Sequence, residues 1–181
     1  VGHSYGGSIV LAMAVRNTPN IKAFISVSPI TSTERKPNLL FKILKIPLIG
    51  PTLRFFMKLC GQNIIKKGMN IAFDPNQKNM PNDFIEKRCM IISLPNNIVT
   101  AAREEMAICQ DLLNLTPLYG NIKKPFFIIH GESDKVVHFN DVIALHENVP
   151  GSKLILFKET GHMVQYARPT ELMKVIEEVS D

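Results

Sequence analysis

Long hydrophobic runs are absent from this sequence, and cysteine is scarce. No stretch of about 18 consecutive apolar residues occurs, so we expect no transmembrane helix. The three cysteines, Cys60, Cys89 and Cys109, are an odd number and form no C-x-x-C pair. This pattern argues against a disulfide framework and favours reduced thiols in a cytoplasmic protein. The sequence begins with Val1 and shows no secretory leader, which leaves open a leader upstream.

Patterns that hold a metal ion or a nucleic acid are also missing. His130, His138, His146 and His162 are separated by eight, eight and sixteen residues, without the short paired spacings of a zinc site. We therefore expect neither a metal nor another cofactor, and we expect the first three histidines to be structural. The formal net charge is +5. No recognised nucleic-acid-binding motif accompanies this charge, so a nucleic-acid partner is not expected.

Both ends of the chain alternate strand-like and helix-like segments. Of the 181 residues, 45% are hydrophobic, which suffices for one domain with a buried core. Buried parallel strands are predicted at residues 23–28, 126–130 and 153–157, because each is a short apolar run. Helices are predicted at residues 5–15, from about 139 to 146, and at 170–179. The apolar side chains of the last helix share one face, which is expected to pack on the sheet.

Residues 31–115 break this alternation and predict helices only. The predicted helices run over residues 39–46, 53–59, 83–92 and 99–113, with breaks marked by prolines at 47, 51, 75 and 81. Thr100 is the expected N-cap of the last of these helices. Because it contains no predicted strand, this part is expected to be a helical insert between two strands. No internal repeat or low-complexity run occurs in it.

Three polar residues follow strands and have the types used in nucleophilic catalysis. Residues 2–6 read GHSYG and match G-x-S-x-G, a nucleophile elbow in which a strand turns sharply into a helix and exposes the serine hydroxyl. Asp134 lies in the loop after the middle predicted strand, and His162 lies in the loop after the last one. A serine needs a base to take its proton, and the base needs an orienting group.

These motifs resemble those of the α/β-hydrolase superfamily. Ser4, Asp134 and His162 follow the chain order of its catalytic triad, and residues 130–137 (HGESDKVV) are similar to its H-G-x-x-D-x-x-V segment. The resemblance implies an α/β-hydrolase fold, in which a mostly parallel sheet is flanked by helices. It also implies that these three residues are catalytic and that the backbone N–H of Tyr5 lies in the oxyanion hole.

The resemblance further implies a division of the chain. Residues 1–30 and 116–181 would form the hydrolase core, and residues 31–115 would form an all-helical cap, or lid. Members of the superfamily carry about four or five strands before the nucleophile, and a loop among them supplies the second oxyanion donor. Only Val1 precedes GHSYG here. We therefore expect this chain to be the C-terminal portion of a longer hydrolase, without the N-terminal strands.

The positive charge is concentrated in the predicted cap. Residues 31–115 hold twelve Lys or Arg residues and seven Asp or Glu residues, so they carry the whole net charge of +5. A solvated cationic helix surface explains this concentration. The alternative is a lid that contacts anionic lipid surfaces or acidic substrates. Apolar residues suited to a lipid-facing helix lie among the lysines: Phe41, Phe55, Phe56 and Met57.

The expected reaction is hydrolysis of an acyl bond in a small-molecule substrate, with lipid-like esters among the candidates. Ser4 would attack the carbonyl carbon, His162 would carry the proton, and Asp134 would orient His162. A carboxylic ester is expected, as for an esterase or a lipase, but thioester, amide and carbon–carbon bond hydrolases and acyltransferases share this chemistry. A truncated, non-catalytic binding module is the alternative. Glu34 is the alternative acid, because in some superfamily members the acid follows the strand before it.

Overall fold

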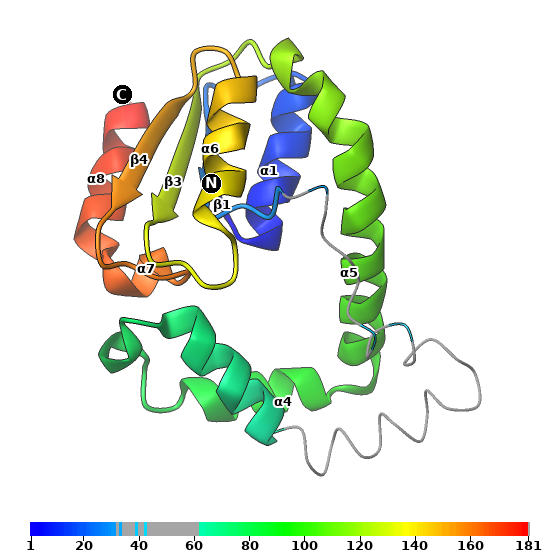
Figure 1. The fold of residues 1–181 in the computed structure, drawn as a ribbon, viewed down its shortest axis with the longest axis vertical. Coiled ribbons are helices and arrows are strands. Elements are labelled where there is room, and N and C mark those ends of the chain that lie inside the picture. Colours follow the sequence, from blue (N-terminus) through cyan, green and yellow to red (C-terminus); the bar gives the residue numbers. More distant parts are fainter. Residues whose placement is uncertain (32, 34–38, 40–41, 43–61, 181) are drawn as a thin grey trace. The chain divides into compact units, whose positions relative to one another are not determined.

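The structure, a computed structural model, describes residues 1–31, 33, 39, 42 and 62–180. The chain forms two compact units (Figure 1). The first contains Val1–Ser32, Ile71–Met80 and Asn114–Asp181, and the second contains Thr33–Asn70 and Pro81–Leu113. Several predictions fall outside the described residues: the helix over 53–59, most of the helix over 39–46, and the residues Glu34, Phe41, Phe55, Phe56, Met57 and Cys60.

The first unit is built on a parallel sheet of four strands, in the order β1-β2-β3-β4. The strands are β1 (Gly2–His3), β2 (Phe24–Val27), β3 (Phe126–Gly131) and β4 (Lys153–Phe157). β2 is buried along its whole length, as its mostly apolar sequence predicts. The expected parallel sheet is therefore confirmed, and β2, β3 and β4 begin and end within one residue of their predicted bounds.

Helices cover both faces of the sheet, because successive side chains of a strand point to opposite faces. α1 (Tyr5–Val15) and α6 (Phe139–Asn148) lie on one face (Figure 1). On this face, the Ser26 hydroxyl of β2 donates to the carbonyl of Gly7 at 2.8 Å. A Cβ at Gly7 would come within 2.9 Å of that hydroxyl, so the glycine allows α1 to pack directly on the strand.

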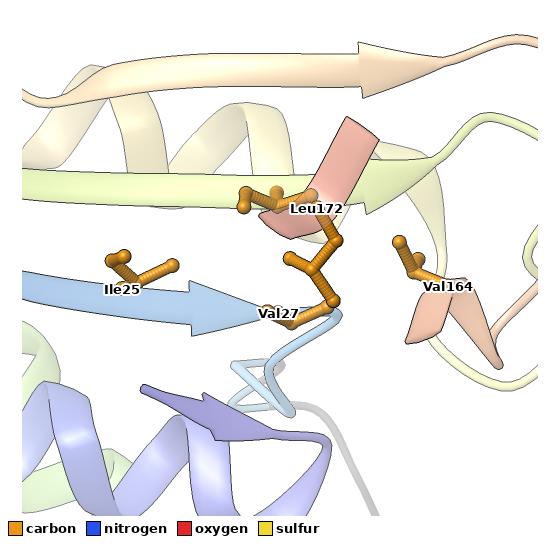
Figure 2. Close-up of a cluster of buried hydrophobic side chains, with 5 residues drawn as sticks. Ile25, Val27, Val164 and Leu172 are labelled. Carbon is orange, nitrogen blue, oxygen red and sulfur yellow. The ribbon is translucent and has the colours of Figure 1, made fainter. Parts of the chain in front are cut away.

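The opposite face of the sheet packs against α7 (Val164–Ala167) and α8 (Pro169–Ser180). Figure 2 shows the buried apolar cluster between them, which consists of Ile25, Val27, Ile129, Val164 and Leu172. Three further residues of α8 pack against this cluster: Val175, Ile176 and Val179. Their spacing of three and four residues places them on one side of the helix. The predicted packing of the last helix on the sheet is confirmed.

One segment of the predicted cap belongs to the first unit instead. The sequence places residues 31–115 in one insert, but Ile71–Met80, which contains the short 3₁₀ helix η1 (Gln77–Asn79), groups with the sheet. Phe73 in this segment is 1% exposed, and its ring lies 5.3 Å from the ring of Tyr166. Burial of this aromatic side chain beside α7 explains the difference. That the rest of the insert forms a cap stays a prediction.

The described part of the second unit is helical. Residues 62–70 are helical, and they are followed after the Ile71–Met80 segment by α4 (Phe84–Ser93) and α5 (Pro95–Leu115). α5 begins four residues before its predicted start, so Thr100 lies inside the helix and is not its N-cap. The fixed φ of proline suits the first turn of a helix, which explains the start at Pro95. A second 3₁₀ helix, η2 (Thr116–Asn121), follows α5.

Three further observations concern the expected location and cofactors. Cys89 and Cys109 form no disulfide bond with any described residue. None of the described helices combines the length and the apolar character needed to cross a membrane. Within the described ranges, no group of three or more histidine, cysteine, aspartate or glutamate side chains is arranged to hold a metal ion. A cytoplasmic location stays a prediction from the cysteine pattern.

Truncation of Leu172 should weaken the packing of α8 on the sheet. Leu172 is 8% exposed, and Leu172→Ala is expected to lower the free energy of unfolding by about 2–4 kcal/mol, because it removes buried apolar area and leaves a cavity. Urea denaturation of the complete protein measures this loss. Met173→Ala is the control: Met173 is the next residue of α8 but is 51% exposed, so the change should stay below about 0.5 kcal/mol. Equal losses in both variants would contradict this packing.

Candidate active site

Ser4 occupies the sharp turn between the last residue of β1 and the first residue of α1. Its φ of 55° lies in the left-handed region, which costs a non-glycine residue about 1–2 kcal/mol. The N–H of Ser4 donates to the carbonyl of Val27 on β2 at 2.9 Å. A Cβ at Gly2 would lie 2.2 Å from the carbonyl oxygen of Gly6, so a glycine is required where strand and helix meet. The structure therefore has the strand–turn–helix that GHSYG predicts.

Asp134 lies in the loop that follows β3. Its Oδ1 accepts the N–H groups of Val136 at 2.7 Å and Val137 at 3.0 Å, and its Oδ2 lies 2.8 Å from Nδ1 of His162. Burial by itself raises the pKa of the Asp134 carboxyl. The hydrogen bonds from His162 and from the two valine N–H groups outweigh burial and lower this pKa below its ordinary value. Asp134 is therefore a buried carboxylate at neutral pH.

His162, in the loop after β4, joins the other two residues in one line of hydrogen bonds. It is 4% exposed. Its Nδ1 lies 2.8 Å from Oδ2 of Asp134, and its Nε2 lies 2.9 Å from Oγ of Ser4. Because an ionised carboxylate can only accept, the hydrogen-bond pattern assigns the proton to Nδ1 and leaves Nε2 to accept the Ser4 hydroxyl. Such an arrangement can withdraw the serine proton and stabilise the resulting imidazolium.

The three loops meet because their strands are parallel. Ser4, Asp134 and His162 follow the carboxyl ends of β1, β3 and β4, and these ends lie at the same edge of the sheet. The structure thus brings together the three residues that the sequence singles out. Tyr5 is the first residue of α1, so the positive end of the helix dipole lies beside Ser4. Glu34, the alternative acid, is outside the described residues.

His3 is part of the site, although the sequence motif does not specify it. It occupies an unrestricted position of G-x-S-x-G. Its Nε2–H donates to the backbone carbonyl of His162 at 2.9 Å, and the two imidazole rings lie 4.7 Å apart. Burial, aided by the nearby His162, lowers the pKa of His3 to about 4. A neutral His3 therefore holds the His162 backbone without placing a positive charge beside its ring.

His130 is fully buried beside Asp134. Its Nδ1 lies 3.8 Å from Oδ2 of Asp134, which is beyond hydrogen-bond distance. Burial lowers the pKa of His130, so its ring is neutral at pH values near 7. The carboxylate of Asp134 therefore has His162 as its one close imidazole donor among the described residues.

Comparison with known sequences identifies a family and distant relatives. The model of the family Hydrolase_4, described as serine aminopeptidase S33, matches residues 1–167. Uncharacterized proteins from Mycobacterium bovis and Mycobacterium tuberculosis are each 24% identical to this chain over 194 residues. Each match covers 100% of this chain and 55% of the relative. The chain thus spans about half the length of the curated relatives that it matches.

Solved structures share the fold at low sequence identity. The meta-cleavage product hydrolase CumD from Pseudomonas fluorescens has a TM-score of 0.71 at 15% identity, over 98% of this chain and 62% of its own. An esterase from Exiguobacterium antarcticum has a TM-score of 0.71 at 20% identity, over 99% and 65%. A bacterial membrane phospholipase A has a TM-score of 0.64 at 18% identity, over 99% and 55%. The α/β fold expected from the sequence is confirmed.

The low pKa of His3 predicts an acid-sensitive fold. The pKa of His3 is about 4 in the folded protein, compared with 6.5 for an ordinary histidine. Between these pH values the unfolded chain binds one more proton, so the free energy of unfolding falls as the pH drops, by up to about 1.4 kcal/mol per pH unit. His3→Gln keeps an N–H donor and removes this titration. Chemical denaturation of the complete protein across that pH range should show a shallower fall for His3→Gln, and equal slopes would contradict a buried, neutral His3.

Proposed function

The chain belongs to the α/β-hydrolase superfamily, through the family described as serine aminopeptidase S33, and we propose that it is a serine hydrolase that cleaves a carboxylic ester or a related acyl bond. The observation that carries the proposal is the line of hydrogen bonds from Ser4 through His162 to Asp134, at 2.9 and 2.8 Å. At these distances a proton can pass from the serine hydroxyl to the imidazole without a rearrangement of the site.

In the proposed reaction, the Oγ of Ser4 attacks the carbonyl carbon of the substrate while Nε2 of His162 takes the hydroxyl proton. The tetrahedral intermediate collapses when His162 returns this proton to the leaving group, and the acyl group stays on Ser4. His162 then takes a proton from water, whose oxygen attacks the acyl-enzyme. The second intermediate collapses when His162 gives this proton to the Oγ of Ser4, which releases the acid and restores the serine. Asp134 keeps the imidazole in the reactive tautomer and stabilises the imidazolium in both steps.

The oxyanion of the intermediate is proposed to bind at the N-terminus of α1. Tyr5 follows Ser4 directly and opens the helix, whose dipole favours negative charge at this end. Its backbone N–H is the proposed donor, and loss of such a donor costs about 10²–10³ in kcat. Because this chain spans 55% of the length of its curated relatives, activity is best measured on the complete gene product.

The nature of the acyl bond is proposed from the chemistry and from the names of similar proteins. An ester comes first, because one similar structure is an esterase and another is a phospholipase A. The family description names an aminopeptidase, and CumD is a meta-cleavage product hydrolase, so amides and carbon–carbon bonds are the competing substrates. A lipid-like substrate is a further candidate, because the net charge of +5 on residues 31–115 would favour contact with an anionic membrane surface. A panel of esters, thioesters and amides of increasing acyl length, together with a meta-cleavage product as the carbon–carbon substrate, distinguishes these classes.

A non-catalytic binding module with this fold is the competing function. Such a module would keep the motifs without turnover. The backbone of Ser4 argues against it, because φ = 55° costs stability and presents a hydroxyl to His162. Strain of this kind persists where the surrounding structure holds it for a function.

Covalent labelling tests the proposed nucleophile. A fluorophosphonate probe is expected to modify Ser4 in the complete protein, because His162 activates its hydroxyl. Peptide mass spectrometry locates the modified residue. Ser4→Ala should abolish labelling, whereas Ser152→Ala, which removes a hydroxyl bound to His146, should label as wild type. A folded wild-type protein that stays unlabelled would favour the binding module.

Substitution of the acid tests the role of Asp134. Asp134→Asn keeps the shape of the side chain but lets its amide N–H face Nδ1 of His162, which favours the wrong tautomer. By analogy with other serine hydrolases, kcat for an ester such as p-nitrophenyl acetate should fall by about 10⁴. Glu34→Gln is the control and should keep activity near wild type. Severe loss in Glu34→Gln with normal activity in Asp134→Asn would assign the acid to Glu34.

A further inference from the structure

The loop that carries His162 is held from two sides. It runs from β4 to α7 and includes Glu159 at φ = 52°, in the left-handed region that costs about 1–2 kcal/mol. On one side, the carbonyl of Thr160 accepts the N–H of Ser133 at 2.9 Å, which ties the loop to that of Asp134. A strained loop keeps one conformation only when its surroundings determine it, so the contacts on the other side matter as well.

Those contacts come from the segment Ile71–Met80, and the carboxamide of Asn76 makes the central pair. Its Nδ2–H donates to the carbonyl of Glu159 at 3.0 Å, and its Oδ1 accepts the N–H of Gly161 at 2.9 Å. The two bonds bracket Thr160 and fix the turn directly before His162. A planar amide provides the donor and the acceptor together, which a hydroxyl or a carboxylate does not do in this geometry.

The same segment also approaches the loop closely at two further points. A Cβ at Gly161 would lie 2.0 Å from the carbonyl oxygen of Asp74, so the two backbones are in direct contact. After His162, the carbonyl of Tyr166 accepts Nδ2–H of Asn79 at 3.0 Å. The segment therefore holds the chain on both sides of His162, and Asn76 makes the two bonds nearest to it.

We propose that Asn76 is a positioning residue for His162, an inference that rests on the proposed function. The imidazole must keep bonds of 2.8 and 2.9 Å in opposite directions, and its placement follows the backbone of its loop. A misplacement of about 1 Å costs about 100-fold in rate. The carboxamide of Asn76 bonds to the backbone of Glu159 and Gly161, and it acts by fixing the turn that carries the base.

Removal of the carboxamide is expected to leave the fold intact. Asn76 borders a cavity of about 480 Å³ that is also lined by Ser133 and Arg168. Water can occupy a polar site of this size and satisfy the backbone groups of Glu159 and Gly161 in its place. Water has no covalent link to the segment, so the turn keeps its hydrogen bonds but loses its fixed position.

The chain offers a matched control in Asn17, which makes the same pair of bonds elsewhere. Its Nδ2–H donates to the carbonyl of Asn121 at 3.0 Å, and its Oδ1 accepts the N–H of Lys123 at 3.2 Å. Asn17 follows α1, and its two partners precede β3. The bridge therefore lies at the opposite edge of the sheet from the loops that carry Ser4, Asp134 and His162. Since Asn17 has φ = 47°, Asn17→Gly removes its bonds without adding backbone strain.

Steady-state kinetics of the complete protein give the first test. Asn76→Ala is expected to lower kcat by about 10- to 100-fold while KM changes by less than about threefold. The reason is that the substitution displaces the His162 imidazole but leaves the substrate-binding contacts unchanged. Asn17→Gly should keep kcat within about threefold. Asn76→Asp keeps an acceptor for the N–H of Gly161 but turns a carboxylate oxygen toward the carbonyl of Glu159, so it should also lower kcat. Wild-type kcat in folded Asn76→Ala or Asn76→Asp would overturn the proposal, as would equal losses in Asn76→Ala and Asn17→Gly.

Proton NMR gives a second test that does not depend on turnover. The proton on Nδ1 of His162, shared with Asp134, should give a strongly deshielded resonance in the wild-type protein. We expect it to broaden or shift in Asn76→Ala and to stay unchanged in Asn17→Gly. An unchanged resonance in Asn76→Ala would overturn the proposal even if the protein turns over no ester, and a changed resonance would support it. Failure of the proposed hydrolase activity is thus separate from failure of the role of Asn76.

Discussion

The hydrogen bond between Nδ1 of His162 and Oδ2 of Asp134 is the contact on which the rest of the site depends. It joins the loops of two adjacent parallel strands, β3 and β4. A buried carboxylate without partners would be strongly destabilising. The imidazole N–H and two backbone N–H groups satisfy Asp134, so it stays ionised although it is buried. The same bond fixes the tautomer that leaves Nε2 of His162 facing Ser4. Stability of the acid and the proposed reactivity of the serine therefore come from one interaction.

Of the imidazoles near Asp134, His162 alone is proposed to transfer a proton. His3 and His130 lie next to the pair, but burial lowers the pKa of each ring. Both rings are therefore uncharged at neutral pH. His3 contributes instead through a hydrogen bond to the His162 backbone. Burial of the neighbouring histidines thus separates structural support from proton transfer.

Much of this arrangement could be predicted from the sequence, because it follows from local patterns. Short apolar runs predicted β2, β3 and β4. The GHSYG motif and the resemblance to the α/β-hydrolase superfamily singled out Ser4, Asp134 and His162. Parallel strands bring such residues to one edge, so a linear order becomes a spatial group. The predicted start of α5 was wrong, because a proline at a helix start leaves little periodic signal. The sequence also placed Ile71–Met80 in the helical insert, because burial of a single phenylalanine leaves no such signal either.

The supporting residues could not be predicted for the same physical reason. Asn76 contacts a loop more than eighty residues away through one amide, and His3 donates to a backbone carbonyl 159 residues later. Side-chain to backbone contacts of this kind have no spacing that a sequence reveals, because any residue can supply the backbone partner. The residues that carry the proposed chemistry were therefore visible in the sequence, while those that hold them in place required the three-dimensional structure.

We propose that the edge of the sheet assembles a serine able to form an acyl-enzyme. The most direct measurement is acid quenching of the complete protein during turnover of p-nitrophenyl acetate, followed by intact mass and peptide mapping. We expect a burst of p-nitrophenol that is about equimolar with the protein, and one acetyl group on the peptide that contains Ser4. Turnover by the wild type without any adduct at Ser4, or an equal adduct and burst in Ser4→Ala, would contradict it.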